Sequence, residues 1–278
     1  MQVCEPPPHG SHLCGFDAHG RAWLRARQQT PYPADVGRID DYRNELRTLP
    51  ADRWVDFLLE NSHLPGPRAN LELAYAVAEE ASPSLIGDIA SSESEFLGAC
   101  GAIGLGRLLA AGDETAAARL RDLAGDPRWR VREGVAMGLQ RLGDSDPVRL
   151  ISLCEEWVEG GSWLVLRAVV AGICEPRLLE GPLPLDWVLD ILDEATRRLA
   201  AASPEDRRTE DHRVLRKALG YCWSVAVAAA PDRAFPRFER LASVEDRDVR
   251  WVVKENLGKN RLRRADPEGC ARVQAAIG

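Results

Sequence analysis

The sequence contains little lysine, few aromatic residues and no long apolar run. Three of its 36 basic residues are lysine, and 6% of its 278 residues are aromatic. The longest apolar runs, 96–106 and 219–230, are shorter than the roughly 20 residues that a membrane-spanning helix needs, so we expect no membrane partner. The net charge of −7 also argues against nonspecific adhesion to nucleic acid or anionic lipid, because such adhesion needs a positive surface.

Signatures of common enzyme classes are missing as well. The sequence contains no P-loop, no GxGxxG after a strand, no HExxH, no CxxC pair and no GxSxG. Its seven cysteines are scattered, and four of them (Cys100, Cys154, Cys174 and Cys222) lie within apolar helical patterns, where a free thiol packs as a small hydrophobic group. These features predict a cytoplasmic protein without a cofactor, and the first thirty residues contain no secretory leader pattern.

Residues 1–36 differ in composition from the rest of the chain. They contain five prolines and three glycines and show no helical apolar period, which predicts an irregular or disordered arm before a domain at 37–278. The arm carries thiol and imidazole groups that are typical zinc ligands, on Cys4, His9, His12 and Cys14. Their spacing matches no zinc motif, so we favour an arm without metal and keep a zinc site as the alternative.

From Ile39 onward, segments with helical apolar spacing alternate with breaks of Pro, Gly, Asp and Ser. Pro50 is suited to the first turn of a helix, and Asn70 is suited to cap the next one. No segment shows sustained strand alternation, so the sequence predicts an all-α fold. Helices are expected near 39–49, 50–59, 71–78, 84–91, 94–111, 113–124, 128–142, 147–158, 162–174, 184–202, 210–229, 232–242, 246–258 and 267–277.

Four of these segments share an aliphatic–Arg step near the start of a helix. The arginines Arg132, Arg167, Arg216 and Arg250 are 35, 49 and 34 positions apart. Periods of this size in a helical chain indicate stacked helix pairs, because one pair cannot bury its apolar stripe alone. In the segment 128–142, two glycines at one face, Gly134 and Gly138, also permit close approach by another helix.

The Asp-x(3–5)-Val-Arg-x(3)-aliphatic pattern, clearest in 126–142 and 246–258, resembles HEAT repeats. The chain also resembles uncharacterised bacterial HEAT-like proteins that carry a stretch similar to NSHLPGPRANLEL, residues 61–73. The resemblance implies a right-handed α-solenoid of about five to six helical pairs with a long concave face. The segments starting at Gly160 and Glu210 depart from the pattern, which leaves the repeat count open.

The loop within 61–73 is a candidate binding element. Two prolines and a glycine predict a rigid loop that presents Arg68 to an anion or a partner. In the structural interpretation, which we favour, the loop is a stiff turn in which Asn70 caps the following helix and Arg68 pairs with a nearby carboxylate.

The repeated arginines and tryptophans also have two interpretations. In the functional interpretation a concave groove is lined by Arg132, Arg167, Arg216, Arg250 and Lys254, and by tryptophans that include Trp129 and Trp251. In the structural interpretation the arginines pair with acids of the adjacent repeat, and the tryptophans fill the core. We favour the pairing for three of the four repeat arginines.

The C-terminal segment has a charge of its own. Residues 246–278 contain eight basic and five acidic residues, so Lys259 and Arg261 in KNRLRR are the best local candidates for contact with phosphate or an acidic peptide.

These features favour a non-enzymatic binding or scaffold module that holds a protein or peptide partner. The alternative partner is nucleic acid, because the architecture also resembles that of HEAT-like-repeat alkylpurine DNA glycosylases. That resemblance implies a basic concave face with an aromatic ring and a carboxylate beside the lesion, for which Trp187 and Asp190 are the candidates. Negative charge near a helix N-terminus gives Asp190 a structural explanation, which we favour.

Overall fold

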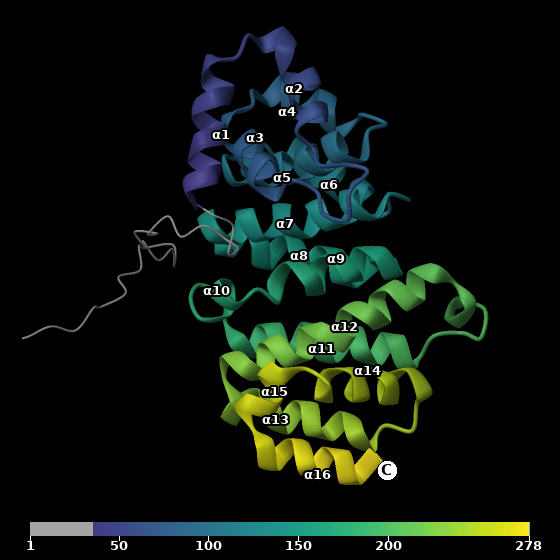
Figure 1. Cartoon of the computed structure of the whole chain (residues 1–278). Coiled ribbons are helices and arrows are strands. Elements are labelled where there is room, and N and C mark those ends of the chain that lie inside the picture. The colour runs from purple at the N-terminus through teal and green to yellow at the C-terminus, as the bar shows by residue number, and fades with distance from the viewer. Residues whose placement is uncertain (1–35, 278) are drawn as a thin grey trace, which may run out of the picture.

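The computed structural model describes residues 36–277, and every regular element in this range is a helix (Figure 1). The prediction of an all-α fold is therefore confirmed. The α-helices are α1 (Val36–Thr48), α2 (Trp54–Glu60), α3 (Leu71–Glu80), α4 (Pro83–Ala90), α5 (Glu95–Ala110), α6 (Thr115–Ala124), α7 (Trp129–Ser145), α8 (Pro147–Gly160), α9 (Trp163–Ile173), α10 (Pro176–Leu179), α11 (Leu185–Ala200), α12 (Glu210–Ala229), α13 (Pro231–Arg240), α14 (Arg247–Leu257), α15 (Asn260–Ala265) and α16 (Pro267–Ile277). Short 3-10 helices are η1 (Ala51–Arg53), η2 (Asp206–Arg208) and η3 (Leu241–Ser243).

Local sequence signals account for most of the helix starts. Serine or threonine side chains accept a hydrogen bond from the third residue on at the starts of α4, α5, α9 and α12, and aspartate side chains cap α8 and α14. Asn70 caps α3 as predicted, since its Oδ1 accepts the Leu73 N–H at 3.1 Å. Two short helices, α10 and α15, lie outside the predicted set, because four to six residues are too few to show an apolar period.

The helices pack in two layers that run along the length of the molecule (Figure 1). In the first layer each helix contacts the next in the series α3, α5, α7, α9, α12 and α14, and α1 packs on α3. In the second layer α4, α6, α8, α11 and α13 each pack against one or more of these. The core lies between the layers, and it includes the fully buried Trp157 and Trp223.

The glycines of α7 permit the closest approach within the first layer. A Cβ added to Gly134 would lie 2.6 Å from the carbonyl oxygen of Ala99 in α5, and one added to Gly138 would lie 2.6 Å from that of Ala102. The sequence therefore predicted this contact surface correctly, and α5 is the helix that occupies it.

The structure bears on two further predictions. None of the helices between residues 36 and 277 is both long and apolar enough to cross a membrane. Val36 already belongs to α1, one residue before the expected start of the domain at 37. The rest of the predicted N-terminal arm, with Cys4, His9, His12 and Cys14, lies outside the described residues.

Candidate functional site

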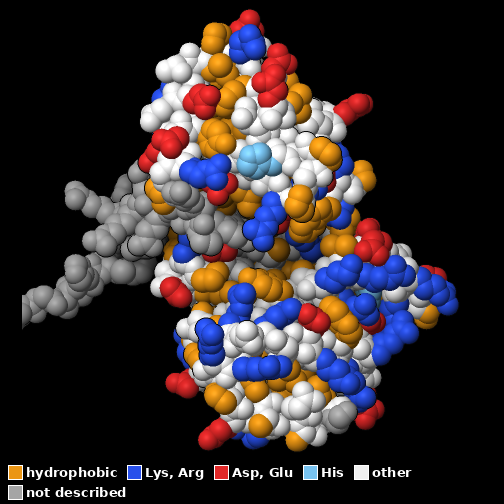
Figure 2. All heavy atoms as spheres, viewed as in Figure 1, with side chains coloured by type: hydrophobic (Ala, Val, Ile, Leu, Met, Phe, Trp, Pro, Cys, Tyr) orange, Lys and Arg blue, Asp and Glu red, His pale blue; other side chains and the backbone are white. Residues whose placement is uncertain are grey.

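A groove of about 680 Å³ opens on the outer surface of the first layer, between α7, α9 and α12. Its floor is mainly apolar, with the start of α3 at one side. Figure 2 shows the same side of the molecule, where apolar side chains form a band across the middle and Lys and Arg are frequent below it. The lining residues are Leu71, Trp129, Arg132, Glu133, Ala136, Met137, Gln140, Arg167, Ala171, Cys174, Glu175, Glu210, Val214, Lys217, Ala218, Tyr221 and Cys222.

Two exposed aromatic rings line this groove. Trp129, at the first turn of α7, is 50% exposed, and Tyr221 of α12 is 44% exposed. Each ring is covered by a guanidinium, because Arg167 lies 5.8 Å from the centre of the Trp129 ring and Arg261 lies 4.4 Å from that of Tyr221. Exposed rings of this size provide apolar contact area for a ligand, and the cations hold them in place.

Arginines in the groove bond to the main chain rather than to acids. Arg132 Nη1 donates to the carbonyl oxygens of Asp126 at 2.6 Å and Pro127 at 2.9 Å, and Arg167 Nη1 donates to the carbonyl of Arg132 at 2.6 Å. The expected pairing with an acid of the adjacent repeat is found for Arg216, whose Nη1 lies 2.6 Å from Asp248 Oδ1. The expectation fails for Arg132 and Arg167, whose guanidinium groups bond instead to carbonyls of the segment before α7 and of its first turn.

Burial disfavours the charged form of several groups in the groove. The pKa of Glu133 is raised by burial, which outweighs the attraction of Arg167 and Arg130. The pKa of Glu175 is also raised by burial, although its ion pair with Arg177 at 2.9 Å acts against the shift. Burial lowers the pKa of Arg167. Perturbed groups of this kind gather where a ligand binds more often than elsewhere.

Sequence reasoning missed the most informative of these residues. Glu133, Met137 and Gln140 follow Trp129 at helical spacing, so they share its face of α7. The Glu133 carboxylate forms no hydrogen bond or ion pair with another side chain of residues 36–277, and the buried Oε1 of Gln140 has no partner there either. Their helical spacing from Trp129 was the one sequence signal that could have placed them beside that ring.

No family model matches the chain, and no curated protein matches it significantly. The groove and the side chains around it are therefore the basis for any statement about function.

The other predicted binding residues lie outside the groove. Arg250 and Lys254 are exposed on α14, and their side chains form no hydrogen bond or ion pair within the described range. The ring of Trp251 packs under Arg216, whose guanidinium lies 4.6 Å from its centre. Lys259 pairs with Glu255 at 2.6 Å, and Arg261 donates to the Tyr221 hydroxyl at 2.9 Å. Arg261 thus bonds to a residue that lines the groove.

The loop 61–70 lies beside the groove, next to Leu71 in its lining. Asn70 is buried and donates to the Tyr42 hydroxyl at 2.9 Å and to the Asn61 carbonyl at 2.8 Å. Arg68 is exposed, and no carboxylate between residues 36 and 277 pairs with it. The stiff capping turn is thus observed, whereas the ion pair expected for Arg68 is not.

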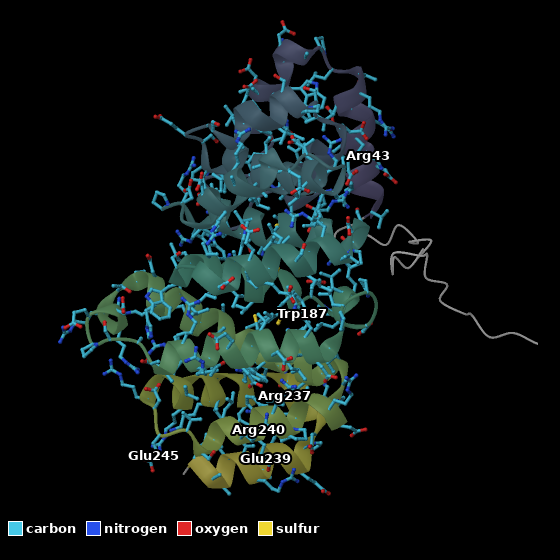
Figure 3. All side chains as sticks on the ribbon, turned by 180° about the vertical axis from the view of Figure 1, so that it is seen from behind. Arg43, Trp187, Arg237, Glu239, Arg240 and Glu245 are labelled. Atoms are coloured by element: carbon cyan, nitrogen blue, oxygen red, sulfur yellow. The ribbon has the colours of Figure 1, made fainter. Side chains whose placement is uncertain are left out.

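The two residues assigned to the glycosylase alternative lie on the second layer. Figure 3, which shows the molecule from behind, labels Trp187 near Arg237 and Arg240. Trp187 Nε1 donates to Glu155 Oε1 at 3.1 Å, and exposed Asp190 pairs with Arg237 at 2.5 Å. Neither residue lines the groove. The structure therefore separates them from Trp129 and the groove arginines.

Two other aspartates of α11 are paired in the same way. Asp186 pairs with Arg233 at 2.6 Å, and Asp193 pairs with Arg237 at 3.1 Å. These bonds tie α11 to α13, so the acidic residues of α11 have a structural role. Within residues 36–277, no cluster of three or more His, Cys, Asp or Glu side chains is placed to hold a metal ion.

Proposed function

We propose that the protein is a non-enzymatic binding module, built as a HEAT-like α-solenoid, whose groove between α7, α9 and α12 holds an extended segment of a protein partner. The observation that carries the proposal is the groove itself, an apolar floor with the exposed rings of Trp129 and Tyr221. Repeat proteins bind partners on extended surfaces of this kind.

Side-chain bonds at regular sequence separation support the solenoid. Arg167 bonds to the carbonyl of Arg132, 35 positions away. Arg177 bonds to Asp144 over 33 positions, and Ser224 bonds to Asn256 over 32. Bonds between equivalent places in successive helix pairs are expected when a chain repeats one structural unit.

The charge of the groove favours a peptide over nucleic acid. Three bases line it (Arg132, Arg167 and Lys217), and so do three acids (Glu133, Glu175 and Glu210). Two of the bases are already bonded to main-chain carbonyls, so few free cations remain to neutralise phosphates. A peptide supplies apolar side chains for the floor and polar main-chain groups for the rim, which suits this balanced lining.

A peptide-display selection on the immobilised full-length protein tests the proposal. We expect enriched peptides to share an aromatic or aliphatic anchor residue and to bind the wild-type protein in solution. The double variant Trp129→Ala/Tyr221→Ala removes both rings, and its affinity for these peptides is expected to fall at least about tenfold. Val148→Ala is the matched control, because Val148 is 60% exposed on α8 and outside the groove.

Two outcomes contradict the proposal. The first is a selection that enriches no peptide above an unrelated protein, and the second is equal binding to the wild-type protein and the double variant. A parallel titration with alkylated and undamaged DNA duplexes at low and physiological salt tests the alternative. Salt-dependent binding with release of the modified base is the result that would favour the glycosylase activity instead.

A further inference from the structure

The solvent-facing side of α14 carries a row of cations. Arg247, Arg250 and Lys254 follow one another at helical spacing, and all three are exposed. The side chains of Arg250 and Lys254 form no hydrogen bond or ion pair with any residue between 36 and 277. Arg247 lies 3.7 Å from Asp248, a buried acid that already accepts from two other arginines. The row therefore presents about 10 Å of positive surface along the helix.

α14 packs on α12, and the two helices run in the same direction. Arg216 bonds to Asp248 near the start of α14, and Ser224 bonds to Asn256 near its end. Between these contacts the Trp251 ring packs under the Arg216 guanidinium, 4.6 Å from its centre. The exposed sides of both helices therefore form one continuous surface. Figure 2 shows Lys and Arg gathered in the lower half of this side of the molecule, where Figure 1 places α12, α14 and α15.

The exposed cations of α12 lie next to the groove. Arg213 and Lys217 are one turn apart, and both pair with Glu210. Lys217 lines the groove, and so does Tyr221, one turn further on. Arg261 of α15 lies 4.4 Å from the centre of the Tyr221 ring and donates to its hydroxyl at 2.9 Å. The positive surface thus begins at the edge of the groove and continues across α12 to α14.

The size and charge of this surface suit a short acidic peptide. An extended peptide advances about 3.3 Å per residue, so three or four residues span the row on α14. A carboxylate pairs well with a single guanidinium or ammonium group. A DNA duplex carries one charge per about 1.7 Å of its axis, so a stable complex needs more free cations than Arg247, Arg250 and Lys254 supply.

We propose that a cationic strip binds acidic residues of the partner segment whose apolar anchor lies in the groove. The proposal rests on the proposed function, and it adds that Asp or Glu residues adjoin the anchor. The carboxylates form ion pairs with exposed cations, and this attraction weakens with salt because charges are screened over about 10 Å at 0.1 M. The strip consists of Arg213, Lys217, Arg247, Arg250, Lys254 and Arg261.

Fluorescence anisotropy with three labelled synthetic peptides tests the strip. Each peptide has the central anchor Phe-Ala-Leu, flanked on both sides by three glutamates, three glutamines or three lysines. At low salt we expect the full-length protein to bind the glutamate peptide at least about tenfold more tightly than the glutamine peptide, and the lysine peptide least tightly. Added salt is expected to remove these differences.

Charge reversal within the strip locates the interaction. Arg250→Glu/Lys254→Glu is expected to abolish the advantage of the glutamate peptide and to leave the affinity for the glutamine peptide unchanged. Arg38→Glu/Arg53→Glu is the matched control, because it changes the net charge equally at two exposed arginines of α1 and η1. This control is expected to keep the advantage. Circular dichroism checks that both variants are folded.

Two outcomes separate this proposal from the proposed function. If Trp129→Ala weakens binding of all three peptides but glutamate gives no advantage, the groove proposal stands and the strip proposal is wrong. If glutamate gives an advantage that Arg250→Glu/Lys254→Glu abolishes and Trp129→Ala leaves intact, the strip binds acidic peptides without the groove, and the groove proposal is wrong.

Three further results overturn the strip proposal. The first is that none of the peptides binds, which contradicts the groove proposal as well. The second is an equal loss of affinity for the glutamate peptide in the two charge-reversal variants. The third is a thymidine oligonucleotide with six phosphates that binds more tightly than the glutamate peptide and is lost in Arg250→Glu/Lys254→Glu, which would assign the strip to nucleic acid.

Discussion

Glu133 is a half-buried carboxylate in the groove, and no residue of the described chain hydrogen-bonds to it. Burial raises its pKa in the folded state. Between its unfolded value, about 4.3, and the raised value, the folded protein binds more protons than the unfolded chain. Stability from this group is therefore present at low pH and is lost as pH rises through the folded pKa. At neutral pH the ionised Glu133 costs stability.

Glu133→Gln is accordingly expected to raise the melting temperature at pH 7 and to leave it nearly unchanged near pH 4. Thermal unfolding followed by circular dichroism across this range checks the prediction. Glu159→Gln, at an exposed glutamate of α8, is the control and is expected to shift the melting temperature little at any pH. A Glu133→Gln protein that is less stable than the wild type at pH 7 would contradict the burial argument.

Single residues also show which contacts could be predicted from the sequence and which could not. The Asn70 cap was predictable, because a cap depends on a side chain and an N–H three residues apart. The bond from Arg167 to the Arg132 carbonyl was not, because it depends on how closely α9 approaches the start of α7. The pairing of Asp190 with Arg237 depends in the same way on the register between α11 and α13.

At the scale of elements, most helices were predictable because each of these carries its own apolar period and stop signals; the short α10 and α15 are the exceptions. The predicted ranges 210–229 and 267–277 coincide with α12 and α16. The groove was harder to predict from the sequence, because it forms where the faces of three helices meet. Trp129 was among the predicted binding residues, whereas Tyr221 was not, since nothing in the sequence distinguishes an exposed ring of α12 from a buried one.

The close contact between α5 and α7 requires glycine, which has no side chain, at Gly134 of α7. An added Cβ at Gly134 would lie 2.6 Å from the Ala99 carbonyl oxygen and 3.0 Å from the Ala99 Cα. Gly134→Ala is therefore expected to destabilise the protein by about 1–3 kcal/mol, although alanine is the better helix former. Urea unfolding measures the change.

Gly160→Ala in α8 is the matched control. A Cβ there lies 3.7 Å from the Arg121 guanidinium, its nearest neighbour, so the change is expected to be neutral or stabilising. Equal effects of the two substitutions would show that helix propensity, and not the approach of α5, decides the outcome at Gly134.

At the scale of the whole molecule, contacts pass from each helix to the next. The first layer runs from α3 in the upper half of the molecule to α14 in its lower half (Figure 1). Asn256 is fully buried near one end, where its Oδ1 accepts the Ser224 N–H at 2.8 Å and its Nδ2 donates to the Leu219 carbonyl at 2.9 Å. It therefore ties α14 to α12.

Asn256→Ala removes two buried hydrogen bonds to main-chain groups of α12, at a cost of about 0.5–1.5 kcal/mol for each. Because the lost bonds are local, hydrogen exchange followed by mass spectrometry is expected to speed up in α12 and α14. Exchange in α3 and α5 is expected to stay close to that of the wild type, as in a chain of nearest-neighbour contacts. The control is Asn44→Ala, at an exposed position of α1. If exchange speeds up equally at both ends, the molecule unfolds as one cooperative unit, and a stack of separable helix pairs is the wrong description of its stability.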